Sequence, residues 1–175
     1  FGGPSMDVAG FCFGQPTQFV GNATDAIDKF QWFFGDGGSD TASSPVHTYA
    51  APGTYNVSLR LTNRCSLDTT LVQKITIFLP PPNPTIPGAT ALCTGVVTLD
   101  ANTANIPDFT YNWSSGDTTQ VVTVSEQSII AVIITDLNGC QSIGQSIVVD
   151  NRPQLDLGPD ISICEDNSTV ALNAQ

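Results

Sequence analysis

Residues Phe30-Gln31-Trp32-Phe33-Phe34-Gly35-Asp36-Gly37 combine a run of large aromatic side chains with an aspartate between two glycines. Trp32 and Phe34 are two positions apart, so in a strand both side chains point to the same face. We expect them to fill a hydrophobic core. Gly35 and Gly37 supply the positive φ of a tight turn, in which Asp36 accepts backbone N–H bonds. The stretch therefore predicts a strand that ends in a tight turn.

A two-residue period continues beyond this turn. Residues 55–61 alternate apolar and polar side chains, as in a half-buried strand. Residues 71–78 and 121–124 indicate further strands, and the more continuously apolar residues 128–135 predict a strand that is central in its sheet. Asn138-Gly139 is a strong hairpin signal. No window of helical period reaches ten residues, so the chain is predicted to be all-β and built as β-sandwiches.

The composition excludes two classes of function. The chain has 175 residues, of which 41% are hydrophobic and only 12% charged, about half the usual charged fraction. Five Lys and Arg against 16 Asp and Glu give a net charge of −11. Such a surface repels phosphate backbones and anionic membrane surfaces, so nucleic-acid binding is excluded. No apolar run approaches the roughly 18–20 residues that span a bilayer, so we expect no membrane insertion.

Proline-rich segments divide the chain into modules. We expect a first module at 1–79, a Pro-rich linker at 80–83, a second module at 84–150 and the start of a truncated third at 151–175. Residues 87–102 resemble residues 157–174 around a cysteine, which favours an array of homologous modules. Because polyproline II is semi-rigid, we expect an elongated array with little contact between neighbouring modules. Both ends suggest a section of a longer chain.

The five cysteines indicate an oxidising, extracellular or cell-surface location. Their long–short spacing predicts one disulfide in each module, Cys12–Cys65 and Cys93–Cys140, with Cys164 unpaired in this part of the chain. No CxxC pair occurs and His47 is the only histidine, so a zinc site is not expected.

Three separated blocks carry a family resemblance: Phe30 to Gly37, Ser44 to Tyr49, and Pro52 to Leu59. Together they resemble the PKD domain, whose signature is a WxFGDG turn followed by P-x-H-x-Y and a G-x-Y-x-V-x-L strand. The resemblance covers residues 8–79 and implies an Ig-like sandwich. The signature residues, which we expect to be structural, are Trp32, Phe34, Gly35, Asp36, Gly37, His47, Tyr49, Gly53 and Tyr55.

The later modules carry a second resemblance. Residues 111–119 around Trp113, and the opening of the third module at 157–164, look like the Ig-like repeats that alternate with PKD domains. Such repeats occur in very large surface proteins of gliding Bacteroidota. The resemblance implies export by the type IX secretion system and a role in adhesion or gliding motility.

Two candidate sites are weighed against structural roles. Some PKD domains bind calcium, and Asp25 and Asp36, with Asp28 and Asp40, are candidates here, but calcium needs about 6–8 oxygens in a spacing that is absent. Phe33 also stands where PKD signatures often have an acidic residue, which weakens such a site. We favour a solvated turn and expect no cofactor.

His47 lacks a second histidine or a Gly-x-Ser-x-Gly elbow to work with, so we expect it to hydrogen-bond the Gly35–Gly37 turn, and we expect no enzyme. Trp32 and Trp113 could stack on sugar rings if they were exposed. Their position in a sandwich favours burial in the core instead.

The sequence therefore predicts a non-catalytic segment of an extracellular adhesin or stalk. Its expected partners are neighbouring repeats of the same chain, like chains in a filament, or a surface polysaccharide or protein ligand. The alternative is an accessory segment of a secreted enzyme that degrades polysaccharide or protein. A third interpretation is a filament subunit whose incomplete third module is completed by a neighbour.

Overall fold

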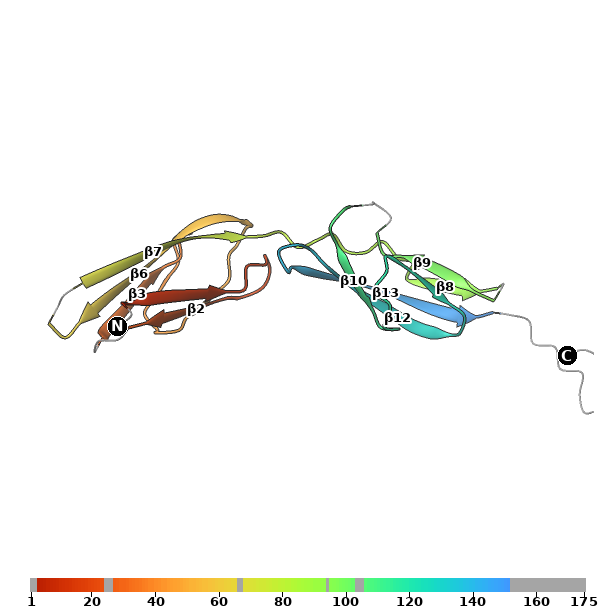
Figure 1. Ribbon diagram of the computed structural model, residues 1–175, viewed down its shortest axis with the longest axis horizontal. Coiled ribbons are helices and arrows are strands. Elements are labelled where there is room, and N and C mark those ends of the chain that lie inside the picture. The colour runs from red at the N-terminus through yellow and green to blue at the C-terminus, as the bar shows by residue number, and fades with distance from the viewer. Residues whose placement is uncertain (1–2, 24–26, 66–67, 94, 103–105, 152–175) are drawn as a thin grey trace, which may run out of the picture.

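The computed structural model describes residues 3–23, 27–65, 68–93, 95–102 and 106–151. Every regular element in this part of the chain is a β-strand, and the strands form two sandwich-like modules (Figure 1). The predicted all-β class is confirmed. The truncated third module and Cys164 lie outside the described residues.

The first module packs two sheets against each other. One sheet has the order β1-β2-β5 and the other the order β4-β3-β6-β7, with antiparallel pairing throughout. The strands are β1 (Ser5–Ala9), β2 (Thr17–Asn22), β3 (Ile27–Phe33), β4 (Ser39–Asp40), β5 (Val46–His47), β6 (Gly53–Asn63) and β7 (Asp68–Ile77). The predicted alternation holds in β6, where Val57, Leu59 and Leu61 are buried.

The second module repeats the plan with fewer strands. Its sheets have the orders β10-β12-β13-β8 and β11-β9. The strands are β8 (Ala89–Leu92), β9 (Val97–Asp100), β10 (Thr110–Trp113), β11 (Val121–Val124), β12 (Ser128–Thr135) and β13 (Gln141–Asp150). The apolar strand β12 is central in its sheet, as its sequence predicts, and Asn138-Gly139 lies in the hairpin between β12 and β13.

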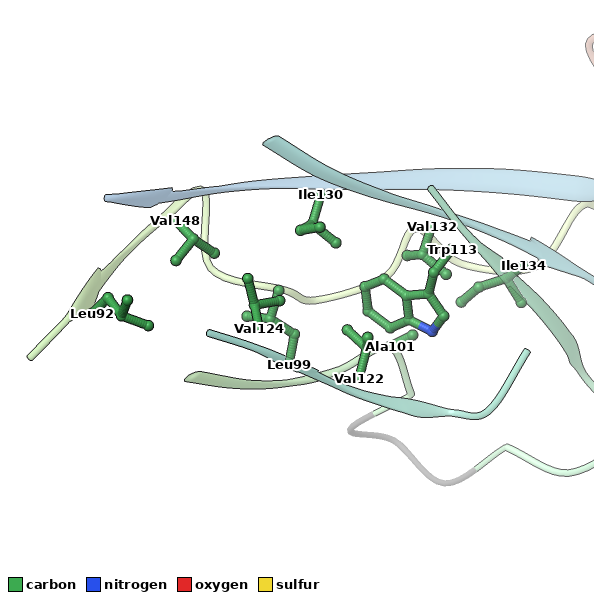
Figure 2. Packing of buried hydrophobic residues seen from close by; sticks show 10 residues of the cluster. All are labelled: Leu92, Leu99, Ala101, Trp113, Val122, Val124, Ile130, Val132, Ile134 and Val148. Atoms are coloured by element: carbon green, nitrogen blue, oxygen red, sulfur yellow. The ribbon is translucent and has the colours of Figure 1, made fainter. Parts of the chain in front are cut away.

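Each module has its own hydrophobic core around a tryptophan. The first core gathers Trp32 with Phe19, Phe34 and the buried residues of β6. In the second core Trp113 lies between the two sheets, with Val132 and Ile134 from β12 and Val122 from β11 around it (Figure 2). Because both tryptophans come from corresponding strands, β3 and β10, the two modules are variants of one plan.

The connection between the modules is packed against the second module rather than free. The hydroxyl of Ser142 on β13 donates to the carbonyl of Pro82 at 3.1 Å. Pro84 and Ile86 lie over Gly144, where an added Cβ would come within 2.8 Å of the Pro84 Cβ. The linker is therefore covered by the second module, which a proline-rich sequence does not indicate, because it predicts only an extended backbone.

Candidate functional site

The turn after β3 is organised around the Asp36 carboxylate. Oδ1 accepts the backbone N–H of Gly38 at 2.9 Å, and Oδ2 lies 2.7 Å from Nε2 of His47 on β5. Gly35 and Gly37 have φ of 86° and 98°. These positions confirm the turn that residues 35–37 predict, and they confirm that His47 hydrogen-bonds it.

These contacts change the acidity of Asp36. Partial burial by itself raises the pKa of the carboxyl, but the hydrogen bonds from His47 and Gly38 and the attraction of His47 outweigh it, so the pKa of Asp36 is lowered. The charged form of Asp36 is thus the one that the turn stabilises.

A ladder of aromatic rings continues from the turn into the core. Phe34 and His47 are stacked, with ring centroids 4.1 Å apart. His47 and Tyr49 are packed edge to face, with ring centroids 4.8 Å apart. The rings of Tyr49 and Tyr55 pack with their centroids 4.2 Å apart. The Tyr49 hydroxyl donates to the carbonyl of Phe34 at 3.1 Å. Burial and then the charge of Asp36 raise the pKa of the Tyr49 phenol, so it stays a protonated donor. These contacts connect β5 and β6 to the turn after β3.

Gly35 is required at its position for two reasons. Its φ lies in the left-handed region, and an added Cβ would lie 2.7 Å from the carbonyl oxygen of Asn56 on β6. The signature motif therefore serves close packing of the turn against the neighbouring strand.

The polar and aromatic side chains of the cluster are engaged with other groups of the protein. The Nε2 of His47 is held by Asp36, and its ring is covered by Phe34 and Tyr49. Both Asp36 oxygens have protein partners, and Asp40 accepts the backbone N–H of Ala42 at 2.7 Å. Within the described ranges no group of three or more His, Cys, Asp or Glu side chains could hold a metal ion. The calcium candidate Asp25 lies outside those ranges.

Both tryptophans are in the core, as predicted. Trp32 is 0% exposed and Trp113 2% exposed. Each indole N–H donates to a backbone carbonyl, that of Ala42 at 3.0 Å and that of Thr119 at 2.8 Å. Neither ring face is available to a sugar. The adjacent Phe33 points the other way and is 47% exposed.

The cysteines pair differently from the expectation. Cys12 forms a disulfide with Cys140, across 128 positions of sequence, so the bond joins the two modules. Cys65 and Cys93 are free and exposed. The predicted pairs Cys12–Cys65 and Cys93–Cys140 are therefore wrong.

The physical reason is the length of the last strand in each module. Cys12 lies beside Phe78, just after β7, whereas Cys65 comes before β7 begins. The ten residues of β7 separate the two ends by about 30 Å, while a disulfide needs Cα atoms about 4.4–6.8 Å apart. The ten residues of β13 separate Cys93 from Cys140 in the same way. Spacing along the chain gives no information on which end of a module a cysteine occupies.

A further feature that sequence reasoning missed is a cationic sheet in the acidic chain. Four of the five Lys and Arg residues of the sequence lie in or directly after strands of the sheet β4-β3-β6-β7: Lys29 in β3, Arg60 in β6, Arg64 just after β6 and Lys74 in β7. The fifth is Arg152. An open pocket of about 540 Å³ lies there, lined by Lys29, Arg60 and Asp68 among others. Arg60 donates to Asp68, and this bond raises the pKa of Arg60 and lowers that of Asp68.

Comparison with known proteins agrees with the fold and the signature turn. Residues 5–78 match the family model described as PKD domain. A segment of a microbial collagenase from Vibrio alginolyticus is 36% identical over 69 residues, which are 38% of this chain and 8% of the collagenase.

Solved PKD structures are similar at lower identity. The PKD1 domain of Vibrio anguillarum Epp is 21% identical, with 45% of this chain and 98% of that chain covered and a TM-score of 0.39. The PKD1 domain of the Vibrio cholerae metalloprotease PrtV is 21% identical, with 42% and 93% covered and a TM-score of 0.38. The family match over residues 5–78 agrees with the signature turn that the first module forms.

Two observations bear on location. The described residues contain no helix that is long and apolar enough to cross a membrane. The disulfide is consistent with a secreted protein.

Proposed function

We propose that this segment is a non-catalytic spacer in a secreted or cell-surface protein, and that it holds other parts of that protein at a set distance and orientation. The observation that carries the proposal is the Cys12–Cys140 disulfide, because it fixes two modules to each other that each have a complete core. A bond between the modules limits bending at the joint. It is not needed to fold either module, since each module has its own hydrophobic core.

The packing at the joint supports the same function. Pro82 and Pro84 lie against Ser142 and Gly144 of β13, so the linker is attached to the second module in addition to the disulfide between the modules. Two separate attachments resist rotation as well as extension. Of the settings for such a spacer, the resemblance of the second module to Ig-like repeats favours an elongated stalk of a surface adhesin, exported by type IX secretion and used in attachment or gliding.

Small-angle X-ray scattering on three forms of the chain tests the spacer. We expect an elongated particle with a narrow distribution of shapes for the oxidised chain. Cys12→Ser with Cys140→Ser should broaden that distribution and leave both modules folded. Cys65→Ser with Cys93→Ser is the matched control and should change nothing. If the first double variant scatters like the control, the bridge does not restrict the joint and the spacer proposal is wrong.

The second candidate function is an accessory segment of a secreted protease, which the 36% identity to a segment of a microbial collagenase favours. In that setting the PKD domain would position a substrate for a catalytic domain elsewhere in the protein. Co-sedimentation of this chain with insoluble collagen fibrils separates the candidates, with serum albumin as the control protein. Binding to the fibrils favours the protease setting, and absence of binding favours the stalk.

A further inference from the structure

Positive charge gathers on the outer face of the sheet β4-β3-β6-β7, although the chain has a net charge of −11. Successive residues of a strand point to opposite faces, and the inward positions of β3 and β6 hold buried residues of the first core. On the outward positions Lys29 lies opposite Thr62, and Gln31 lies opposite Arg60. The next strand, β7, adds Asp68 opposite Thr62. Lys29 and Arg60 are therefore diagonal neighbours on one surface.

An open pocket of about 540 Å³ lies over these residues, and we call it the outer-face pocket. Two of the residues that line it are the cations Lys29 and Arg60. Three others are neutral and can exchange hydrogen bonds with hydroxyl groups: Gln31, Thr41 and Thr62. The pocket therefore combines positive charge with amide and hydroxyl groups.

Asp68 positions Arg60 in the outer-face pocket. Arg60 donates to one oxygen of the Asp68 carboxylate, and the hydroxyl of Thr62 donates to the other at 2.6 Å. A guanidinium has five N–H donors, of which this bond uses one, and the Arg60 side chain is 56% exposed. Lys29 is exposed and forms no ion pair with any residue in the described ranges. Two cations and one engaged carboxylate give the pocket a net charge of +1.

An apolar platform continues the same face beyond the pocket. Phe33 follows Gln31 on the outward side of β3 and is half exposed, and Val72 on β7 is 67% exposed. Both lie opposite Ser58 on β6, so they form one row across the sheet. Four residues of strand separate Lys29 from Phe33, which is about 14 Å. A ligand of that length can contact the cations and the aromatic ring together.

We propose that this face binds an acidic sugar, a uronic acid unit in an extracellular polysaccharide. Arg60 and Lys29 bind its carboxylate, because charge-assisted hydrogen bonds to a carboxylate are the strong ones. The ring hydroxyls bond to Gln31 and Thr41, and the C–H face of a neighbouring sugar packs on Phe33. The site deepens the proposed function, since it gives the spacer a ligand class, and it lies entirely in the first module.

The composition of the site favours a sugar over an acidic peptide. Neutral hydrogen-bonding residues outnumber the cations in the pocket, as suits a ligand that has several hydroxyl groups for each carboxylate. The exposed ring of Phe33 suits the flat C–H face of a pyranose. The net charge of −11 on the whole chain repels a dense polyanion, so we expect the acidic units to be spaced by neutral sugars.

NMR titration of the ¹⁵N-labelled chain tests the site. The probe is a trisaccharide of two xylose units and one glucuronic acid, at millimolar concentrations. Xylotriose, which lacks the carboxylate, is the matched control ligand, and acetyl-Gly-Glu-Gly-amide supplies one carboxylate on a peptide. We expect the acidic trisaccharide to shift backbone amides in residues 29–33 and 58–62, and to bind about fivefold more tightly than either control ligand.

Two variants separate the pocket from the overall charge. Lys29→Gln should weaken binding of the acidic trisaccharide about threefold. Lys74→Gln makes the same change in net charge, but Lys74 lies opposite Asn56, and the residues that line the pocket do not include it. It should leave the affinity unchanged, and the same spectra show that both variants are folded.

Four outcomes would overturn the site: no shifts on this face, equal binding of xylotriose, equal binding of the peptide, or equal weakening by the two lysine variants. Equal binding of the peptide would make the face a general carboxylate site, and equal weakening would make the attraction a property of the whole chain. None of these outcomes depends on the joint between the modules, which scattering measures. Failure of the site and failure of the spacer are therefore distinguishable.

Discussion

Trp32 and Phe33 are neighbours in β3 with opposite environments, and this contrast yields a prediction at the scale of single residues. Trp32 is fully buried and Phe33 about half exposed. We expect Trp32→Ala to lower the free energy of unfolding by about 3–5 kcal/mol, because it leaves a cavity in the first core.

Phe33→Ala is the matched control and should change the free energy of unfolding by less than about 1 kcal/mol. Urea denaturation measures both. Equal losses in the two variants would contradict the assignment of Trp32 to the core.

Asp36 makes the stability of the first module depend on pH. Its folded pKa is lowered below the ordinary value of 3.8. Its contribution is therefore fully present well above pH 3.8 and is lost as the pH falls through the folded pKa. We expect Asp36→Asn to reduce stability by about 1 kcal/mol at neutral pH and to flatten the acid side of the stability curve.

Asp117 provides the comparison for Asp36, since it lies in the turn after β10 and its carboxylate accepts the hydroxyl of Ser115 at 2.7 Å. Asp117→Asn should change neutral stability less than Asp36→Asn. Thermal unfolding between pH 2 and 7 measures both, and a full acid dependence in Asp36→Asn would exclude this carboxyl as its source.

At the scale of elements, the turn between β3 and β4 depends on its contact with β6. Gly35 and Gly116 follow the tryptophan strands of the two modules, and both have positive φ. A Cβ at Gly35 would meet the Asn56 backbone at 2.7 Å, whereas a Cβ at Gly116 would have nothing within 4 Å.

We expect Gly116→Ala to cost about 1–2 kcal/mol, which is the cost of left-handed backbone alone. Gly35→Ala should cost more, because the turn must also move away from β6. Denaturant titration of both variants compares them. If the two losses are the same, the close approach to β6 has no energetic consequence.

At the scale of the whole molecule, the joint depends on the absence of a side chain at Gly144. A Cβ there would lie 2.8 Å from the Pro84 Cβ, so Gly144→Ala should lift the linker from β13 and break the bond between Ser142 and Pro82. We expect a loss of about 1–3 kcal/mol and faster amide exchange at Thr85 and Ile86.

Gly88→Ala is the control, because a Cβ at Gly88 would have nothing within 4 Å. Hydrogen–deuterium exchange with mass spectrometry compares the two variants. Unchanged exchange in Gly144→Ala would mean that the linker does not depend on this contact.

Local patterns predicted the elements and the signature turn of this protein. The alternation in β6, the limits of β11 and β12, and the contact of Asp36 with His47 all follow from residues close in sequence or from the PKD resemblance. Burial of Trp32 and Trp113 follows as well, because a large aromatic residue in a half-buried strand turns its side chain to the apolar face of the sheet.

The arrangement at the joint was accessible only from the tertiary structure. Cys12 and Cys140 are 128 positions apart in sequence. No local pattern indicates that they lie at the ends of the two modules that face each other in space. The same holds for Pro84 over Gly144. Periodicity records which side of a strand is buried, whereas a contact between modules depends on which end of each strand faces the neighbour, and that is set by the three-dimensional path of the whole chain.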